Sequence, residues 1–177
     1  KDVKRLGHIY ASHEANAVTL AKTAKKACEE LGIEFVESTV TNSSEVKQAA
    51  QSIAGRVDAF YLSTDNTVIS ALAAVADVAK ANKLPIMSAD PSSAEKYEVF
   101  AAWGFDYYKI GKATGKLIGR ILKGEKPESM PTIFMTDPSD VDLLINLDVA
   151  KRLGITIPDD IVKKASRVVK DGKMTKK

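Results

Sequence analysis

Short apolar segments alternate with longer amphipathic segments over the first 123 residues, and this alternation limits the possible folds more than any other feature. The longer segments repeat apolar residues at intervals of three and four, which is the spacing of one face of a helix. Strands that alternate with such helices form a parallel sheet covered on both faces. The sequence therefore predicts an α/β fold: a three-layer, doubly wound parallel sheet of the flavodoxin-like or Rossmann-like type. Strands are expected at residues 5–10, 33–39, 57–63, 84–89 and 98–105.

Several helix boundaries carry recognisable signals. Gly32 follows the first helical pattern and is a typical helix stop. Asn42 is suited to cap the second helix, with Glu45 three positions further on. Gly124 follows the last long pattern. Helices are expected at residues 17–31, 42–55, 66–81 and about 107–123.

The regular alternation ends at Gly124. Three prolines fall within residues 127–138, which is typical of a connection rather than of another helix between two strands. One more strand is expected at residues 141–147, followed by a short helix at 148–153. A last helix is expected to begin at Pro158, a residue suited to the first helical position. The basic residues 163–177 are interpreted as a solvated helix face with a frayed end.

Composition indicates a globular protein, with 45% hydrophobic residues, 28% charged residues and a net charge of +3. This mixture excludes the disordered, collagen-like and disulfide-rich classes. The basic residues at the C-terminus have no aromatic residues between them, so they do not favour nucleic-acid binding. Cys28, the only cysteine, lies on the apolar side of a helical pattern and is expected to be a buried thiol. The sequence holds no run of 18 apolar residues.

Three unusually polar segments follow predicted strands: residues 11–16 (ASHEAN), 63–67 (STDNT) and 88–93 (SADPSS). In open parallel sheets, ligands bind beyond the carboxyl ends of the strands, where such loops meet. The N–H groups at a helix N-terminus suit a ligand carboxylate, whereas Asp65 or Asp90 would suit a ligand ammonium group. Asp65, Asn66 and the serines at 92 and 93 are also good helix caps, so both interpretations stay open for each residue.

Motifs of common enzymes are missing. The first strand is not followed by a Gly-x-Gly-x-x-Gly loop, and the sequence has no phosphate-binding Gly-Lys-Ser/Thr, Cys-x-x-Cys or His-Glu-x-x-His motif. His13 has no identifiable nucleophile or carboxylate partner and is interpreted as an exposed loop residue. We therefore expect no catalytic residues, no metal site and no cofactor.

Long stretches of the sequence resemble a known family. They are RLGHIYASHEANAV, SSEVKQAAQSIAGRVDAFYLSTDNTVISALAAV, PIMSAD, GFDYYKIGKATGKLIGRILKGEKPE and LLINLDVAKRLGITIPDDIVKKA. Together they are similar, in order and over nearly the whole chain, to the substrate-binding proteins of ABC transporters. The relevant family includes tryptophan- and tyrosine-binding members.

The resemblance implies a type I periplasmic-binding-protein fold, in which two Rossmann-like lobes close on a small ligand. Residues 1–104 resemble the second, C-terminal lobe, and residues 105–177 resemble the segment that returns to the first lobe and the hinge. The first lobe is otherwise absent from this chain. Asp106 is the hinge candidate. The ligand-side residues that match the family are Glu14, Asn16, Thr64, Asp65, Asn66 and Asp90.

The function implied by the resemblance is solute binding for an ABC importer, without catalysis or cofactor. The solute would be amino-acid-like, an aromatic amino acid being one candidate, and the partner of the full-length protein would be the transporter permease. The location would be extracytoplasmic, either periplasmic or lipid-anchored at the outer face of the cytoplasmic membrane. The alternative is an isolated lobe that acts as a sensory or self-associating module, forming a homodimer through the surface left by the missing lobe.

Two positions depart from the family pattern. Where the family commonly has Asn-Pro-Gly-Glu-Ala-Asn-Ser, this chain has ASHEANA at residues 11–17, so the proline-glycine turn and the serine hydroxyl are lost while Glu14 and Asn16 are kept. Trp103 stands where a smaller residue is usual, and we expect it to alter the hinge or the wall of the cleft.

Overall fold

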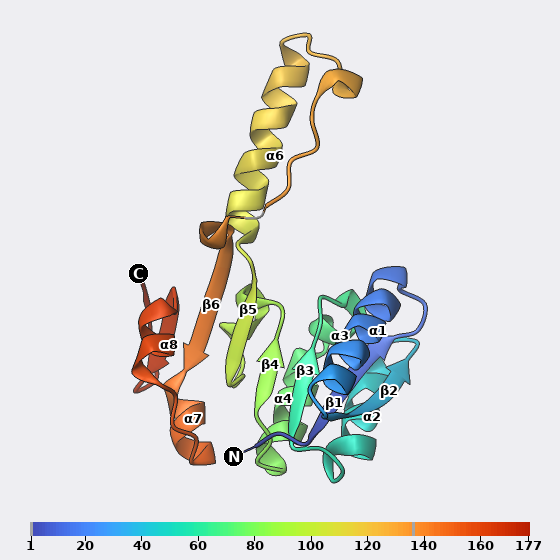
Figure 1. Ribbon diagram of the computed structural model, residues 1–177, viewed down its shortest axis with the longest axis vertical. Coiled ribbons are helices and arrows are strands. Elements are labelled where there is room, and N and C mark those ends of the chain that lie inside the picture. Colours follow the sequence, from blue (N-terminus) through green and yellow to red (C-terminus); the bar gives the residue numbers. More distant parts are fainter. Residues whose placement is uncertain (1, 136) are drawn as a thin grey trace.

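A computed structural model describes residues 2–135 and 137–177. It contains one eight-stranded sheet with the order β2-β1-β3-β4-β5-β6-β7-β8 (Figure 1). The strands are β1 (Arg5–Ala11), β2 (Glu34–Val40), β3 (Ala59–Leu62), β4 (Ile86–Ser88), β5 (Ala101–Phe105), β6 (Val141–Asn146), β7 (Arg167–Lys170) and β8 (Lys173–Lys176). The first five strands are parallel in the order 2-1-3-4-5, so the predicted α/β, flavodoxin-like sheet is confirmed.

The helices follow the predicted alternation as far as residue 81. They are α1 (Ala15–Glu30), α2 (Val46–Ala54), α3 (Asn66–Ser70), α4 (Leu72–Ala81), α5 (Pro91–Ala94), α6 (Tyr107–Leu122), α7 (Leu147–Leu153) and α8 (Asp159–Lys164). Short 3₁₀ turns lie at Ser43–Glu45, Pro127–Ser129 and Pro138–Asp140. Asn42 accepts a hydrogen bond from the amide of Ser44, as expected of a cap. The helix predicted over 66–81 is two helices, because the backbone leaves helical geometry at Ala71.

The alternation of side chains in β1 shows why both faces of the sheet are covered. Ile9 and Ala11 point into the main apolar core, which also contains α2, α4 and the fully buried Phe60. His8 points to the opposite face, which α1 covers, and Lys25 of α1 lies 3.9 Å from Glu37 on that side. We call these two faces the α2 face and the α1 face. The predicted three-layer arrangement follows from this alternation.

The segment after β5 differs from the predicted β-α repeat. Helix α6 does not cover the sheet but projects beyond its upper edge, and the chain returns along it through residues 126–135 (Figure 1). We call residues 107–135 the arm. Every residue of α6 is at least partly exposed, because the helix has no sheet to pack against. The prediction of a fifth β-α unit of the sheet was therefore wrong, although the helix itself lies where it was expected.

The return from the arm adds three strands to the same sheet. Strand β6 is antiparallel to β5, with Phe105 opposite Val141 and Ala101 opposite Ile145. A strand was expected here, at 141–147. Because β6 runs antiparallel to β5, the sheet is mostly rather than fully parallel. Helix α8 begins at Asp159, with Pro158 at the preceding cap position instead of inside the helix.

The C-terminal residues form a β-hairpin instead of the predicted solvated helix and frayed end. Strands β7 and β8 are antiparallel and joined by Asp171 and Gly172, which both have positive φ. The carboxylate of Asp148 in α7 accepts hydrogen bonds from both turn amides, at 2.8 and 2.9 Å, and these bonds lower the pKa of Asp148. The Asp-Gly turn was the available signal for this hairpin, and the surrounding lysines obscured it.

Ion pairs join the C-terminal elements to the rest of the lobe. Arg167 of β7 is largely buried and contacts the carboxylates of Asp142 and Glu95. Glu98 accepts from Lys80 of α4 and Arg152 of α7, each at 3.0 Å. These pairs connect β7 to β6 and to the segment before β5, and Glu98 connects α7 to α4. No helix among the described residues is long and apolar enough to cross a membrane.

We predict that Gly104→Ala destabilises the fold by about 1–3 kcal/mol, as expected for overpacking. A Cβ on Gly104 would overlap the carbonyl oxygen of Ala89 and lie 2.9 Å from Cδ of Pro91. Urea denaturation followed by circular dichroism measures the effect. Gly111→Ala is the matched control, because that site in α6 is open and alanine favours helix. Equal stability of the two variants would contradict the close approach.

Candidate functional site

The polar loops after β1 and β3 meet at the carboxyl edge of the sheet. Asp65 is 2% exposed and lies at the centre of this junction. One of its carboxylate oxygens accepts from the amide of Val68 at 2.9 Å and caps α3. The other accepts from the amide of Ala11, at the end of β1, at 2.6 Å. Asp65 therefore fixes the first helical turn after β3 against the neighbouring strand.

Glu14 makes a second connection between the same two loops. It stands at the N-cap position of α1, yet its carboxylate binds the start of α3 instead. It accepts from the amide and hydroxyl of Thr67, at 3.0 and 2.7 Å, and from the amide and side chain of Asn66, at 3.3 Å. The hydroxyl of Thr67, together with the two amides, lowers the pKa of Glu14 and keeps it ionised. Thr67 was not singled out from the sequence, although its position in the first turn of α3 was visible.

Asn16 completes this pairing of loops. Its side-chain amide donates to the carbonyl oxygen of Thr64 at 3.0 Å, while Ser12 lies over the end of β2 and donates to Val40. The structure thus brings together five of the six predicted ligand-side residues. They are Glu14, Asn16, Thr64, Asp65 and Asn66.

Asp90 lies in the third loop, after β4, and is 9% exposed. Its carboxylate accepts from the amide and hydroxyl of Ser92, at 3.0 and 2.7 Å. Burial and the negative charge of Asp90 together raise the pKa of Tyr107, which places the start of α6 near this loop. The close approach of Gly104 to Ala89 brings the two segments together. Tyr107 therefore lies near the candidate site.

Asp106, the hinge candidate, caps α6. Its carboxylate accepts from the amides of Tyr108 and Lys109 at 2.9 and 3.3 Å. Its own amide donates to the carbonyl of Asp140 at 3.0 Å, so it joins the two chain segments at the base of the arm. This is the position expected of a hinge residue, and the hinge role itself stays a prediction.

The N-terminus of α1 is open at the edge of the polar loops. α3 and α6, which start at the same edge, are capped by the side chains of Asp65 and Asp106, whereas α1, like α2 and α4, has no side-chain cap and no acidic residue in its first turn. Within the described residues, its N–H groups therefore remain available at the edge where the three loops meet. A helix N-terminus carries a partial positive charge and free donors, which suit a carboxylate.

Two buried polar groups lie on the α1 face below the loops. His8 is fully buried, and its Nδ1 lies 2.8 Å from the carbonyl of Tyr61. The Nε2 of His8 and the hydroxyl of Ser63 are the buried side-chain atoms of the described residues that have no hydrogen-bond partner. Because a carbonyl oxygen only accepts, the bond to Tyr61 assigns a proton to Nδ1. Burial lowers the pKa of His8 and favours the neutral ring, in which Nε2 is an unused acceptor.

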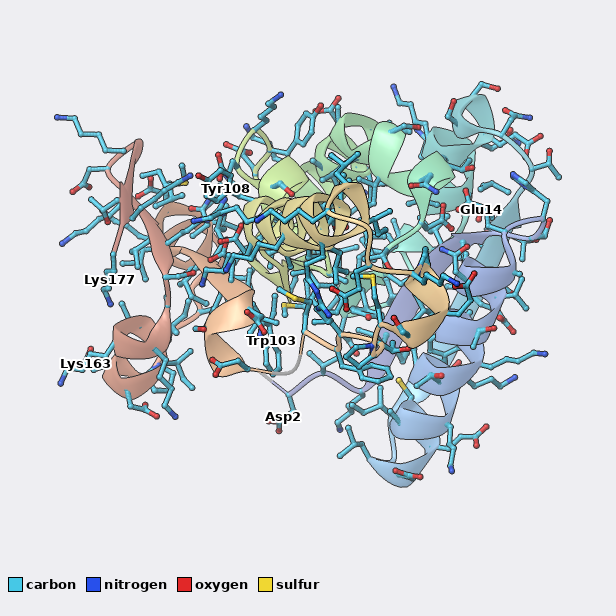
Figure 2. The ribbon with its side chains drawn as sticks, turned by 90° about the horizontal axis from the view of Figure 1, so that it is seen from above. Asp2, Glu14, Trp103, Tyr108, Lys163 and Lys177 are labelled. Carbon is cyan, nitrogen blue, oxygen red and sulfur yellow. The ribbon has the colours of Figure 1, made fainter. Side chains whose placement is uncertain are left out.

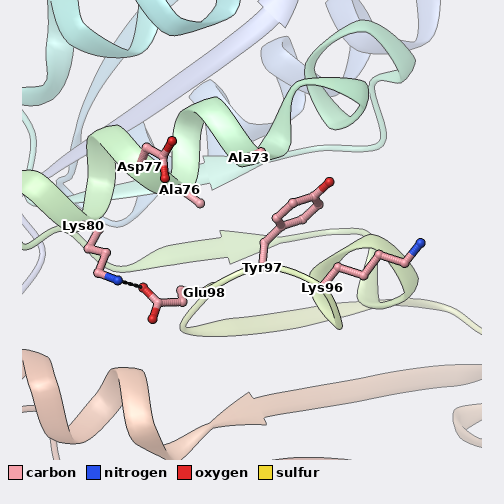
Figure 3. Close-up of a pocket in the computed structure, with 7 residues that line it drawn as sticks. All are labelled: Ala73, Ala76, Asp77, Lys80, Lys96, Tyr97 and Glu98. Atoms are coloured by element: carbon pink, nitrogen blue, oxygen red, sulfur yellow. Dashed lines mark ion pairs between the residues drawn. The ribbon is translucent and has the colours of Figure 1, made fainter. Parts of the chain in front are cut away.

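Other chemistry receives little support from the geometry. Within the described part of the chain, no group of three or more histidine, cysteine or acidic residues could hold a metal ion. Cys28 is buried as predicted, and burial raises the pKa of its thiol. A small cavity of about 190 Å³ lies between α4 and the segment before β5, where Lys80 pairs with Glu98 (Figure 3). It lies away from the three loops, and the charged residues Lys80 and Glu98 that line it form a structural ion pair.

The fold and this edge of polar loops define a lobe of the periplasmic-binding-protein class. The family model described as ABC transporter substrate binding protein matches residues 1–169. The chain therefore belongs to this family, whose members bind solutes and are not enzymes.

Similar proteins support the same assignment. A tyrosine-binding protein from Clostridioides difficile is 32% identical over 150 residues, which cover 85% of this chain and 42% of that protein. A solved conserved domain protein from Vibrio cholerae is 37% identical, with a TM-score of 0.84 over 96% of this chain and 55% of the other. A solved ABC domain in complex with L-Trp from Streptococcus pneumonia is 32% identical, with a TM-score of 0.84 over 94% and 55%. The chain thus spans about half the length of these relatives.

We predict that Asp65→Ala lowers the free energy of unfolding by about 1–3 kcal/mol, because it removes a helix cap and leaves the buried amide of Ala11 unpaired. Urea denaturation is the measurement. Asn66→Ala is the control, since it keeps both Asp65 bonds and lies at the exposed side of the loop. A loss no larger than that of the control would contradict the central position of Asp65.

A second prediction concerns pH. Burial lowers the pKa of His8, against the hydrogen bond to Tyr61 and the charges of Asp65 and Glu37, which raise it. The unfolded chain therefore binds a proton more readily than the folded one, so this contribution to stability is present above about pH 6.5 and is lost as the pH falls further. Denaturation at pH 7.5 and 5.0 should show a smaller decrease for His8→Gln than for the unchanged chain. An identical decrease would exclude His8 as the cause.

Proposed function

We propose that this chain is the ligand-binding lobe of the solute receptor of an ABC importer. The solute would be amino-acid-like, with an aromatic amino acid as the leading candidate. Family membership supports solute binding, and the printed ligands of two relatives, tyrosine and L-Trp, support the solute class.

The observation that carries the proposal is the uncapped N-terminus of α1, set among the three polar loops. An amino acid needs a donor group for its carboxylate and an acidic group for its ammonium. The first turn of α1 supplies the donors, while Glu14 and Asp90 supply negative charge at the same edge. Asp65 contributes by holding the loops, and any direct contact with the solute would use the remaining lone pairs of its carboxylate.

The arm supports the part of the proposed division in which the chain leaves the lobe after residue 104, while β6, β7 and β8 return to the sheet of the lobe. Ile118 is 51% exposed, Leu122 82% and Phe134 75%, which is unusual for residues of this size. In our proposal this surface packs on the first lobe of the full-length receptor, and the cleft lies between that lobe and the loops after β1, β3 and β4. Residues 1–104 then form most of the second lobe, and residues 105–177 include the segment that visits the first lobe. The permease would be the partner, at an extracytoplasmic location.

The same exposed surface favours a second candidate function. As an isolated lobe, the chain would bury Ile118, Leu122 and Phe134 against a second copy and act as a sensory or interaction module. Light scattering separates the two proposals. A monomer over a wide concentration range argues against the module, while a stable dimer argues for it.

We predict that the full-length receptor binds L-tryptophan or L-tyrosine by isothermal titration, and that Glu14→Ala weakens binding by about tenfold. The substitution frees α3 from α1 and removes one negative charge from the cleft edge. Glu45→Ala is the matched control, because Glu45 makes similar loop bonds to Thr41 away from the three loops. Absence of heat with any amino acid would refute the solute class.

A further inference from the structure

A second and larger cavity lies on the α1 face, away from the three loops. Its volume is about 820 Å³, which is within the range of about 300–1,000 Å³ typical of small-molecule sites. It lies between β5, β6 and α8, below the start of the arm. The cleft proposed above is built from the loops after β1, β3 and β4, so the two sites share no loop.

Apolar side chains form the floor of the cavity. Trp103 of β5 is opposite Leu143 of β6, and both line it together with Val141 and with Ile161 of α8. Trp103, which is labelled in Figure 2, is 60% exposed. An exposed indole beside aliphatic side chains offers a flat surface on which an aromatic ring can stack.

The cavity is lined by more lysines than aspartates, and the aspartates have more hydrogen-bond and ion-pair partners within the chain. Lys109, Lys164 and Lys177 line it, against Asp106 and Asp142. Asp142 is paired with Arg167 and accepts from Ser166, while Asp106 caps α6. Both carboxylates therefore already have partners within the chain, Arg167 and Ser166 for Asp142 and two backbone amides for Asp106.

The lysines are less strongly engaged. Lys177 donates to the carbonyls of Val162 and Lys163, and Lys109 donates to the carbonyl of Ser139, so the partners of both in these bonds are neutral. Lys164 lies 4.0 Å from Asp160, with 72% of its side chain exposed. The three lysines and two aspartates that line the cavity leave an excess of one positive charge, which favours an anion.

We propose that this cavity binds a small aromatic carboxylate, with its ring on Trp103 and its carboxylate toward Lys164. Trp103 and the lysines line the same space, which fits a ligand with one apolar and one anionic end. The solute cleft plays no part in this site. Trp103 lines this cavity together with Asp106, the hinge candidate, and its expected effect on the hinge or cleft wall stays a prediction.

The test uses Trp103 as its own reporter, because it is the only tryptophan of the chain. The probe is 4-nitrobenzoate, a non-fluorescent aromatic carboxylate that quenches indole emission, and 4-nitrobenzyl alcohol is the neutral control. We expect saturable quenching by the carboxylate with an unchanged fluorescence lifetime, which indicates a complex. The alcohol should bind more weakly.

Two lysine variants on α8 test whether the Lys164 side chain binds the carboxylate of the probe. Lys164→Gln should weaken the carboxylate by about two- to fivefold, as expected for a largely exposed ion pair, and leave the alcohol unaffected. Lys163→Gln is the matched control, because the neighbouring Lys163 side chain does not line the cavity. Quenching that rises linearly with concentration, equal affinity for carboxylate and alcohol, or equal effects of the two lysine variants would each overturn the proposal.

Discussion

The buried carboxylate of Asp65 holds together the part of the structure on which the candidate site depends. A carboxylate that is 2% exposed would be costly without partners, and the amides of Ala11 and Val68 supply them. Because one amide belongs to the end of β1 and the other to the first turn of α3, the same side chain that caps a helix also sets the position of two neighbouring loops. Glu14 and Asn16 then extend this contact from the loop after β1. The ligand edge is therefore fixed by bonds within the lobe.

This arrangement separates two roles that acidic residues in such loops can have. Asp65, Asp106 and Glu14 satisfy the starts of α3 and α6, and so those helix ends are closed to a ligand carboxylate. Glu14 stands at the N-cap position of α1, but its carboxylate binds the start of α3 and leaves the start of α1 uncapped. The exchange creates an open N-terminus at α1 and stabilises α3 at the same time. The open end of α1 therefore follows from where the Glu14 carboxylate binds.

The first five strands could be predicted because each is a short apolar run bounded by turn residues, and the order 2-1-3-4-5 is that of the predicted flavodoxin-like type. Asn42 and Cys28 also behave as their local patterns indicated. The hairpin at Asp171 was missed, since its strands are half-exposed and rich in lysine, and its stability comes from Asp148, 23 residues away. The dual bonding of Asp65 could not be read from residues 63–67 alone, because the second partner lies 54 residues earlier. The exposed position of α6 could not be predicted either. An amphipathic pattern shows that one face of a helix needs an apolar surface to pack against, and it does not show whether that surface is the sheet of the same lobe.

The antiparallel pairing of β5 and β6 has a consequence for how the arm could have been acquired. Phe105 and Val141 are register partners, so their Cα atoms lie about 5 Å apart at the point where the chain leaves the sheet and returns. Two strands that end opposite one another can be closed by a tight turn. Residues 106–140 thus have the geometry of an insertion into a β-hairpin. The sheet would be continuous with or without them, which allows this region to lengthen, shorten or be exchanged over evolution while the lobe beneath it keeps its fold.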